Sequence, residues 1–349
     1  MKPVSVLLTC DIHTHTYGVE QVHRDLQAVQ RILQEMRLPC TFFFPAESAE
    51  MLRGQVDELQ REGHEIGCHG LTHDPSEQYS RLPVSQQEPF LQQATERLSR
   101  LLEKPPISFR APAFKVSGQT MRILEGLGYE ADLSVNSQRL GALGSDITNL
   151  APLWAPRCPY HPSSSNPYRK GNGRLLEIPV SAWILPFVSN SERLLGLGFM
   201  RGFFRFLYGE SRLTGKPIVF VFHAEDLNAQ RGKQRRARWS WRYLRPSRTY
   251  GFEFRYLLFE CDWQRVQEDQ VALFRYMAGF PNVRFLTVRD YLRCYNERGP
   301  AQFQTDALSK EAISANLRSA PLTGRALLGL GLGGGSLGSN DPASPDPLR

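Results

Sequence analysis

The sequence predicts an α/β fold built on a mainly parallel sheet, and two patterns along the chain support this. Short apolar runs rich in β-branched and aromatic residues, such as VSVLLTC at 4–10 and CTFFF at 40–44, are typical of buried strands. Amphipathic stretches follow them, and at 19–37 the apolar residues recur at helical spacing. Buried strands that alternate with amphipathic helices indicate either a barrel or a doubly wound sheet.

The same alternation continues to residue 298. Further strands are expected at 64–68, 107–112, 175–181, 217–223 and 283–288, and further helices at 49–63, 89–104, 118–129, 262–280 and 288–298. We therefore expect one domain over residues 1–298, with a loop excursion at 140–172 and an apolar and basic insertion at 191–248. Residues 299–349 are rich in Gly, Ser and Pro and predict a flexible tail.

The composition is that of an ordinary globular protein, but the charge is basic. With 41% hydrophobic and 22% charged residues, a fibrous or wholly disordered chain is excluded. The net charge of +7 and the pI of about 9.2 favour anionic partners. Much of this charge lies at 231–248, where basic and aromatic residues interleave. That pattern suits a phosphate backbone, a lipid interface or a solvated loop, and these alternatives stay open.

The cysteines and the N-terminus indicate a cytoplasmic protein. The six cysteines are widely separated and form no C-x-x-C pair, so a reducing compartment is the simpler interpretation. The apolar run near the N-terminus is too short for a signal peptide or a membrane span.

Potential metal ligands occur in two short motifs. CDIHTHT at 10–16 alternates Asp11, His13 and His15 directly after the first strand. HGLTH at 69–73 follows the third strand and places His69 and His73 four residues apart, a spacing that suits two imidazole ligands of one divalent ion.

Two more polar residues stand at strand ends, where functional groups collect in parallel α/β folds. Arg110 in FRAPAF can hold a carboxylate by a bidentate contact. His223 ends the strand FVFH and is suited to proton transfer. A core histidine that only hydrogen-bonds a carbonyl oxygen would give the same sequence pattern.

Taken in order, these motifs resemble the polysaccharide deacetylases, the NodB-homology or carbohydrate esterase family four group. TCDIH is similar to the family's TFDD motif, HGLTH to H-S/T-x-x-H, and RAPAF to R-x-P-Y/F. YEADLSV, with Asp132, and FVFH are similar to the fourth and fifth motifs. The resemblance is close over residues 4–135 and extends to about 295.

The resemblance implies a distorted (β/α) barrel of about seven strands and a divalent metal ion, with zinc expected. It implies that Asp11 is the general base, that Arg110 orients Asp11, that His223 protonates the leaving amine and that Asp132 tunes His223. It also implies that His69 and His73 are metal ligands.

The first motif departs from the family pattern. The second aspartate of TFDD, a metal ligand, is replaced here by Ile12, which cannot bind a metal. The spacing D-x-D that some members use would instead place the third ligand at His13, giving a three-histidine site with an open position for water. Phe114, His15 and Phe222 are predicted to contact the substrate.

The expected activity is removal of an N-acyl group, acetyl or formyl, from an amino sugar, a polysaccharide or a lipid-linked glycan precursor. The mixture of apolar residues and arginines at 191–210 suits a helix at a membrane interface, or an ordinary helix packed on the barrel. A peripheral contact with the inner face of the membrane is therefore expected, and nucleic acid is not expected as a partner.

Two other functions fit parts of the sequence. DIHTH suits the first motif of an amidohydrolase or a PHP-type metal hydrolase, but LTHD does not match the later T-D-H motif of those barrels. A non-catalytic relative that uses the same fold to bind carbohydrate is the second alternative.

Overall fold

The computed structural model describes residues 3–74, 76–138, 151–232, 246–247, 251–252 and 261–298. The predictions for the tail at 299–349, for most of the basic segment 231–248 and for residues 140–150 of the loop lie outside the described residues.

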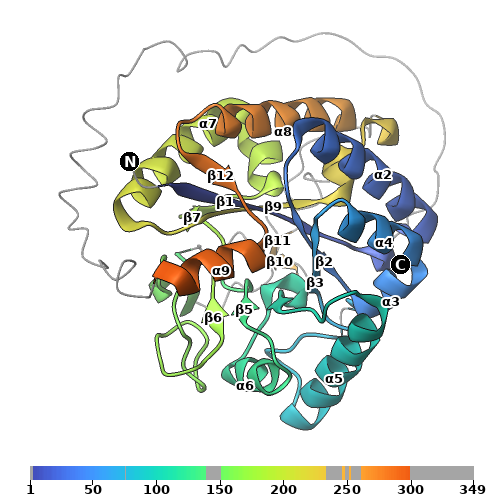
Figure 1. Ribbon diagram of the computed structural model, residues 1–349, viewed down its shortest axis with the longest axis vertical. Helices are drawn as coiled ribbons and strands as arrows, with labels where there is room; N and C mark the ends of the chain where they lie inside the picture. Colours follow the sequence, from blue (N-terminus) through green and yellow to red (C-terminus); the bar gives the residue numbers. More distant parts are fainter. Residues whose placement is uncertain are drawn as a thin grey trace. The chain divides into compact units, whose positions relative to one another are not determined.

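A single sheet of parallel strands forms the centre of the described chain (Figure 1). Strand β9 pairs with one edge of β1, while β12 and β2 pair with successive parts of its other edge. Strands β3 to β6 follow β2 in order. Because β12 and β2 share one edge of β1, the sheet has seven strand positions around its curve. The expected distorted (β/α) barrel is confirmed. The strands of this sheet are β1 (Val4–Asp11), β2 (Thr41–Phe44), β3 (Glu65–Cys68), β4 (Ser108–Phe109), β5 (Ala131–Asp132), β6 (Leu176–Glu177), β9 (Ile218–His223) and β12 (Val283–Phe285).

The gap between the last strand, β6, and β9 is narrowed by the chain that follows β6. The amide of Ser181 donates a hydrogen bond to the carbonyl oxygen of Val219 in β9 at 3.4 Å. Val188 forms a further parallel bridge with Val221. The sheet therefore curls back from β6 toward β9, and the carboxyl ends of its strands lie around one opening.

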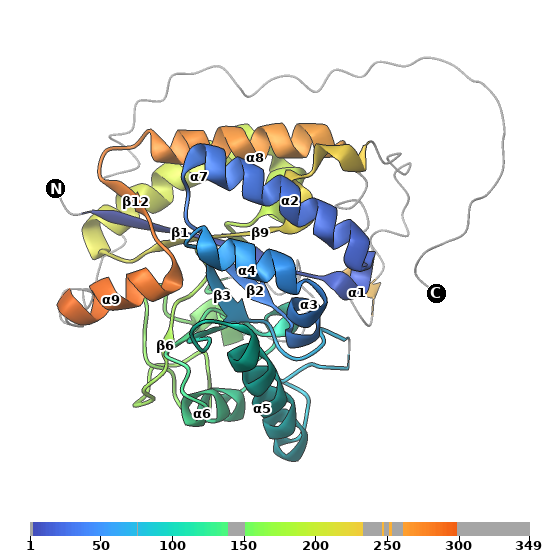
Figure 2. The same cartoon turned by 45° about the vertical axis from the view of Figure 1, so that its right-hand side comes forward.

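Helices surround the curled sheet (Figures 1 and 2). Their apolar faces pack on the outer side of the strands, where the largest cluster of buried apolar residues lies. The helices are α1 (Thr14–Tyr17), α2 (Val19–Met36), α3 (Ala46–Met51), α4 (Arg53–Arg61), α5 (Val84–Leu101), α6 (Gly118–Gly126), α7 (Ser189–Thr214), α8 (Trp263–Ala278) and α9 (Val288–Arg298). Two antiparallel pairs stand outside the sheet: β7 (Ala182–Trp183) with β8 (Leu185–Pro186), and β10 (Pro246–Ser247) with β11 (Gly251–Phe252).

The predicted elements are present, with two adjustments. The helix expected at 49–63 is two helices, α3 and α4, that meet at Leu52. The segment expected as an insertion from residue 191 begins with α7 and β9, which form a regular helix-and-strand unit of the barrel. Among the described helices, none has both the length and the apolarity needed to cross a bilayer.

Candidate active site

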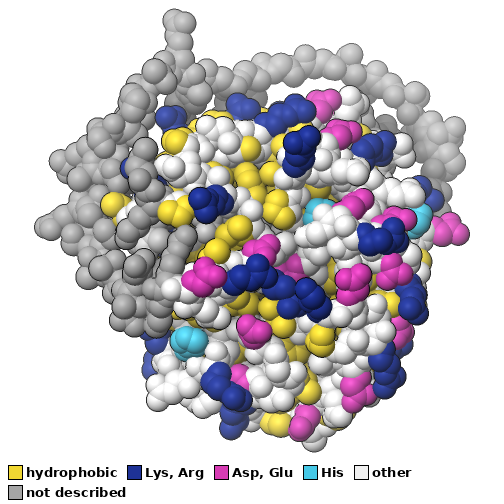
Figure 3. All heavy atoms as spheres, viewed as in Figure 1, with side chains coloured by type: hydrophobic (Ala, Val, Ile, Leu, Met, Phe, Trp, Pro, Cys, Tyr) yellow, Lys and Arg dark blue, Asp and Glu magenta, His cyan; other side chains and the backbone are white. Residues whose placement is uncertain are grey.

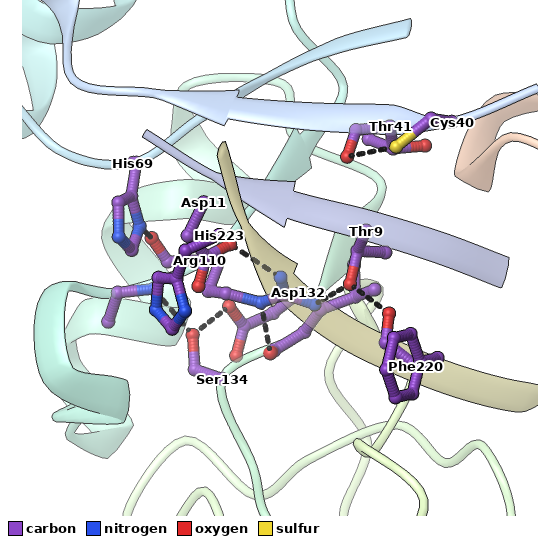
Figure 4. Close-up of polar contacts among 12 residues, drawn as sticks. Thr9, Asp11, Cys40, Thr41, His69, Arg110, Asp132, Ser134, Phe220 and His223 are labelled. Carbon is purple, nitrogen blue, oxygen red and sulfur yellow. Dashed lines mark hydrogen bonds and ion pairs between the residues drawn. The ribbon is translucent and has the colours of Figure 1, made fainter. Parts of the chain in front are cut away.

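Four strands bring the candidate residues to one end of the barrel. Asp11 and His223 end β1 and β9 and are register partners across those strands. His69 directly follows β3, and its amide donates to the carbonyl oxygen of Phe44 at 2.8 Å. Arg110 directly follows β4, and its amide donates to the carbonyl oxygen of Cys68 at 2.9 Å. Parallel pairing thus places groups far apart in sequence around one opening (Figure 4).

Arg110 is fully buried, and its donors have defined acceptors (Figure 4). Nη1 pairs with Oδ1 of Asp11 at 2.6 Å, Nη2 donates to the hydroxyl of Thr9 at 3.0 Å, and Nε donates to the carbonyl oxygen of Leu133 at 3.1 Å. Burial by itself would raise the pKa of Asp11, but the charge of Arg110, aided by His69 and His223, lowers it below the usual value. Asp11 is therefore a fixed, ionised carboxylate that can accept a proton.

Three imidazoles lie close together at the same end of the barrel as Asp11. His13, His69 and His73 each offer a nitrogen within 4.8 Å of the other two. Nδ1 of His69 is 2.7 Å from the carbonyl oxygen of Arg110, which can only accept, so Nδ1 carries the proton and Nε2 presents a lone pair. The Nε2 atoms of His13 and His69 are buried without a hydrogen-bond partner. Unpaired buried acceptors are costly unless they bind something, so this donor set fits a metal ion.

The protonation of these imidazoles also suits metal binding. Burial lowers the pKa of His69 to about 3. Burial lowers the pKa of His13 well below its usual value and also lowers that of His73, and the neighbouring imidazoles add to the effect on His13. All three are therefore neutral near pH 7, the form in which histidine binds a metal. Ile12, at the position of the missing carboxylate ligand, is fully buried in the apolar core.

The loop that carries His73 is organised by Glu77, a residue that belongs to none of the sequence motifs. Its carboxylate accepts hydrogen bonds from the amides of Leu71, Thr72 and His73 at 2.7–2.9 Å. His73 has a left-handed backbone with φ of 64°, which costs energy for a residue other than glycine. Glu77 therefore holds the second histidine of HGLTH in an orientation that the chain alone would not favour.

His223 is paired with Asp226, which corrects the expected role of Asp132. Asp226 Oδ2 lies 3.7 Å from Nδ1 of His223 and accepts a hydrogen bond from its amide at 2.7 Å. Burial would lower the pKa of His223, but Asp226, together with the charges of Glu225 and Asp11, raises it above the usual value. The pKa of His223 is thus shifted upward, whereas those of the other three imidazoles are shifted downward.

Arg193 from α7 forms a buried ion pair with Asp226 and stacks on Trp263, whose ring centroid is 4.7 Å from its Cζ. Burial alone would raise the pKa of Asp226, but the charge of Arg193 and the contacts with His223 lower it. Asp226 therefore stays ionised beside His223. Arg193 is too distant from His223 and Asp226 in the sequence to be recognised as their partner. Asp226 could have been identified in HAED, three residues after His223.

Asp132 accepts a hydrogen bond from the hydroxyl of Ser134 at 2.6 Å, and the carboxylates that act on His223 are those of Asp226, Glu225 and Asp11. The register partner of Asp132 on β6 is Glu177. Burial raises the pKa of both carboxyl groups, and the neighbouring Asp132 charge raises that of Glu177 further. Oδ2 of Asp132 and Oε2 of Glu177 are both buried without a partner. A proton on Glu177 that is shared with Asp132 satisfies both atoms.

This pair predicts different effects for two substitutions of Glu177. Glu177→Gln replaces the O–H donor of the protonated acid by an N–H donor and keeps an acceptor for the amide of Val135, so the free energy of unfolding should change by less than about 1 kcal/mol. Glu177→Ala should lose about 1–3 kcal/mol, because the amide of Val135 loses its acceptor. Since the folded-state pKa of Glu177 is raised, its contribution in the wild type is present at low pH and is lost as the pH rises through that pKa. The stability of Glu177→Gln relative to wild type should therefore improve with rising pH. Denaturant unfolding measures both effects, and equal losses for Gln and Ala would contradict the shared proton.

The three residues expected to contact substrate lie in different places. Phe114 is half-buried beside Arg110, with its ring centroid 5.6 Å from Cζ. His15 is 52% exposed, and its Nε2 is 3.5 Å from Asp74 Oδ2. Phe222 is fully buried in the core against Phe274, with ring centroids 5.7 Å apart. The expectation for Phe222 is therefore wrong, because successive strand residues face opposite sides and His223 occupies the inner side.

A curled (β/α) barrel whose strand ends gather an arginine-paired aspartate and four histidines is the arrangement that the motifs predict. Residues 2–131 match the family model described as "Polysaccharide deacetylase". This part of the chain is similar to the polysaccharide deacetylases, which confirms the resemblance indicated by the motifs.

One relative is a peptidoglycan deacetylase of Helicobacter pylori, which is 30% identical over 105 residues. That match covers 30% of this chain and 35% of the relative, so it spans about a third of the relative's length.

Solved structures share the fold over a larger part of the chain. A putative polysaccharide deacetylase from Mycobacterium smegmatis superposes with a TM-score of 0.56 at 14% identity, over 85% of this chain and 91% of that one. A protein named Puue allantoinase superposes with a TM-score of 0.54 at 13% identity, over 85% and 91% of the two chains. At these identities the likeness shows the fold alone.

Proposed function

We propose that the protein is a metal-dependent hydrolase that removes an N-acyl group, acetyl or formyl, from an amino sugar. The observation that carries the proposal is the geometry of the site. Asp11 is paired with Arg110 at 2.6 Å, His223 is paired with Asp226 at 3.7 Å, and the three close imidazoles of His13, His69 and His73 lie at the same end of the barrel. A candidate base and a candidate acid beside a set of metal ligands suit hydrolysis of an amide.

The chain's own residues supply the proton transfers. Asp11 accepts a proton from the attacking water, and Arg110 fixes the carboxylate in the required orientation. His223 donates its proton to the nitrogen of the leaving amine, and the nearby carboxylate of Asp226 raises the pKa of His223. When bound by His13, His69 and His73, a divalent ion, which we propose to be zinc, supplies Lewis acidity that acidifies water and polarises an acyl carbonyl.

The substrate class rests on the homology region and the named relatives. The similarity to a peptidoglycan deacetylase supports a glycan carrying N-acylated amino sugars. The allantoinase of the same fold acts on a different molecule, so the fold does not choose the substrate. We further propose a lipid-linked glycan precursor as substrate, with the protein in the cytoplasm at the inner face of the membrane.

The amidohydrolase or PHP-type alternative has less support. It would use both histidines of DIHTH as ligands, yet His15 is half exposed, pairs with Asp74 and belongs to no described group of three ligand residues. A non-catalytic carbohydrate-binding relative would have no use for a candidate base paired with Arg110 and a candidate acid paired with Asp226 beside a set of metal ligands.

Metal analysis tests the proposal together with assays on N-acetylated and N-formylated amino sugars. Purified wild type should hold a divalent ion and release the acyl group. His13→Ala and His69→Ala should each lose metal affinity by more than the roughly 10–100-fold that removal of a supporting residue costs, and should lose activity. His23→Ala, which changes an exposed histidine of α2, is the matched control and should retain both.

Three outcomes would redirect the proposal. Retained metal and activity in His13→Ala would contradict the three-histidine site. Loss of metal in His15→Ala would favour the amidohydrolase or PHP-type alternative. Binding of acylated sugars by wild type without release of the acyl group would favour the carbohydrate-binding alternative.

A further inference from the structure

Helix α7 has one side that is fully used in packing. Met200, Phe203, Phe204 and Leu207 are buried there, and the ring of Phe204 lies against Phe280 with centroids 5.1 Å apart. The helix lies beside α8 on the outside of the barrel (Figures 1 and 2). Packing on the barrel therefore accounts for most of the apolar residues of this helix, and only the exposed Leu194, Leu195, Phe199 and Leu213 need a separate explanation.

Apolar side chains also cover the outward side of α7. A break at Gly196, with φ of 78°, turns the first part of the helix. After it, Phe199, Phe206 and Leu213 recur every seven residues and form one row. The tip of the β7–β8 hairpin adds to this row, since the ring of Trp183 stacks on Phe206 with centroids 5.1 Å apart. Six large apolar residues here are each 40–51% exposed: Trp183, Ile184, Leu194, Leu195, Phe199 and Leu213.

The exposed charged side chains of α7 all have the same sign. Arg201, Arg205 and Arg212 are exposed and, by their spacing of four and seven residues, form a second row about a third of a turn from the apolar one. The two acidic residues of the helix are turned inward: Glu192 pairs with Gln270, and Glu210 pairs with Arg157 and Lys216.

Other parts of the described surface carry charges of both signs. On the face seen in Figure 3, basic and acidic side chains are interspersed. Helix α2, for example, exposes both Glu20 and Arg24. Segregation of arginines along an exposed apolar row is therefore a feature of α7 and not of the whole surface. An exposed apolar row alone could contact many kinds of partner. The neighbouring row of arginines favours a partner surface that is both apolar and anionic.

We propose that the exposed side of α7 and the tip of the β7–β8 hairpin, together called the α7 surface, bind to an anionic lipid bilayer. Leu194, Leu195, Phe199 and Trp183 would enter the headgroup region, and the arginines would contact lipid phosphates. The first turn of the same helix carries Arg193, the partner of Asp226 beside His223. Docking would thus bring the bilayer to one side of the active site. Only the further step, that a lipid carries the acylated sugar, rests on the proposed function.

Sedimentation of the full-length protein with lipid vesicles tests the α7 surface. Wild type should bind vesicles of phosphatidylglycerol and phosphatidylcholine, and should bind pure phosphatidylcholine much more weakly. The triple variant Arg201→Gln, Arg205→Gln, Arg212→Gln should lose about a hundredfold in partition coefficient, because each arginine near an anionic surface contributes about fivefold. Leu195→Ser with Phe199→Ser should lose about tenfold.

The matched control is Arg24→Gln, Arg31→Gln, Arg53→Gln, which removes the same charge from exposed positions of α2 and α4. It should bind within about twofold of wild type, since these positions lie outside the α7 surface. Equal losses in the two triple variants, or equal binding of wild type and the α7 triple variant, would overturn the proposal. A homodimer that dissociates on Leu195→Ser with Phe199→Ser would also overturn it, because a second copy would then cover this side.

The vesicle assay is independent of catalysis. His69→Ala, expected to be inactive, should bind vesicles as wild type does. Failure of the deacetylase proposal would leave this result unchanged, and failure of the docking proposal would leave the metal and activity measurements unchanged.

Discussion

Replacement of Asp11 by Asn is expected to lower kcat/KM for N-acyl hydrolysis by about a thousandfold, within the range typical of the loss of a general base. The carboxylate is held at 2.6 Å by Arg110, and its pKa is lowered, so at neutral pH it is the ionised group best placed to accept a proton. An amide has nearly the same shape and cannot accept that proton.

Metal content separates the roles that Asp11 could have. If His13, His69 and His73 form the ligand set, Asp11→Asn should keep its metal while it loses activity. A second group of close ligand atoms combines Asp11, His13 and His223, so loss of metal in this variant would show that Asp11 is a ligand. Asp57→Asn, a carboxylate change on α4, serves as the control and should keep both metal and activity.

Much of the site could be predicted because the ends of buried strands can be recognised in the sequence. Asp11, His69, Arg110 and His223 each stand at or directly after an apolar strand, and parallel pairing forces such positions to one end of a sheet. His13 was predicted from the D-x-D spacing that some members of the family use, and Ile12 is buried in the core. The alternation of side chains along a strand excludes Phe222 as a substrate contact, because His223 faces the site.

The supporting residues could not be predicted in the same way. Glu77 and Arg193 act through side chains that reach a neighbouring loop or strand end, and no periodic pattern reports such contacts. Asp132 was assigned by its place in a motif, yet side-chain direction at the end of a two-residue strand depends on how the neighbouring strands curl. Motif order thus locates the reacting groups, whereas their partners depend on the tertiary structure.

The substitution Asp226→Asn should change the pH dependence of the reaction. His223 must be protonated to act as the acid, and Asp226 is the largest influence that raises its pKa against the effect of burial. Without that charge the pKa of His223 falls, so the protonated form is lost at a lower pH. The alkaline limb of kcat/KM against pH should move to lower pH, and activity at pH 8 should fall about tenfold for each unit of pKa lost.

Stability must be separated from this effect, because Asp226→Asn also leaves Arg193 buried without its carboxylate partner. Breaking such a pair costs about 3–5 kcal/mol, whereas removing both charges is often close to neutral. The double variant Asp226→Asn with Arg193→Met keeps an unbranched side chain against Trp263 and should recover most of the lost unfolding free energy. It should nevertheless keep the displaced alkaline limb, since the carboxylate beside His223 is still absent. A double variant with a wild-type pH profile would show that Asp226 acts only through the stability of the fold, and that another group, such as Glu225, keeps His223 protonated.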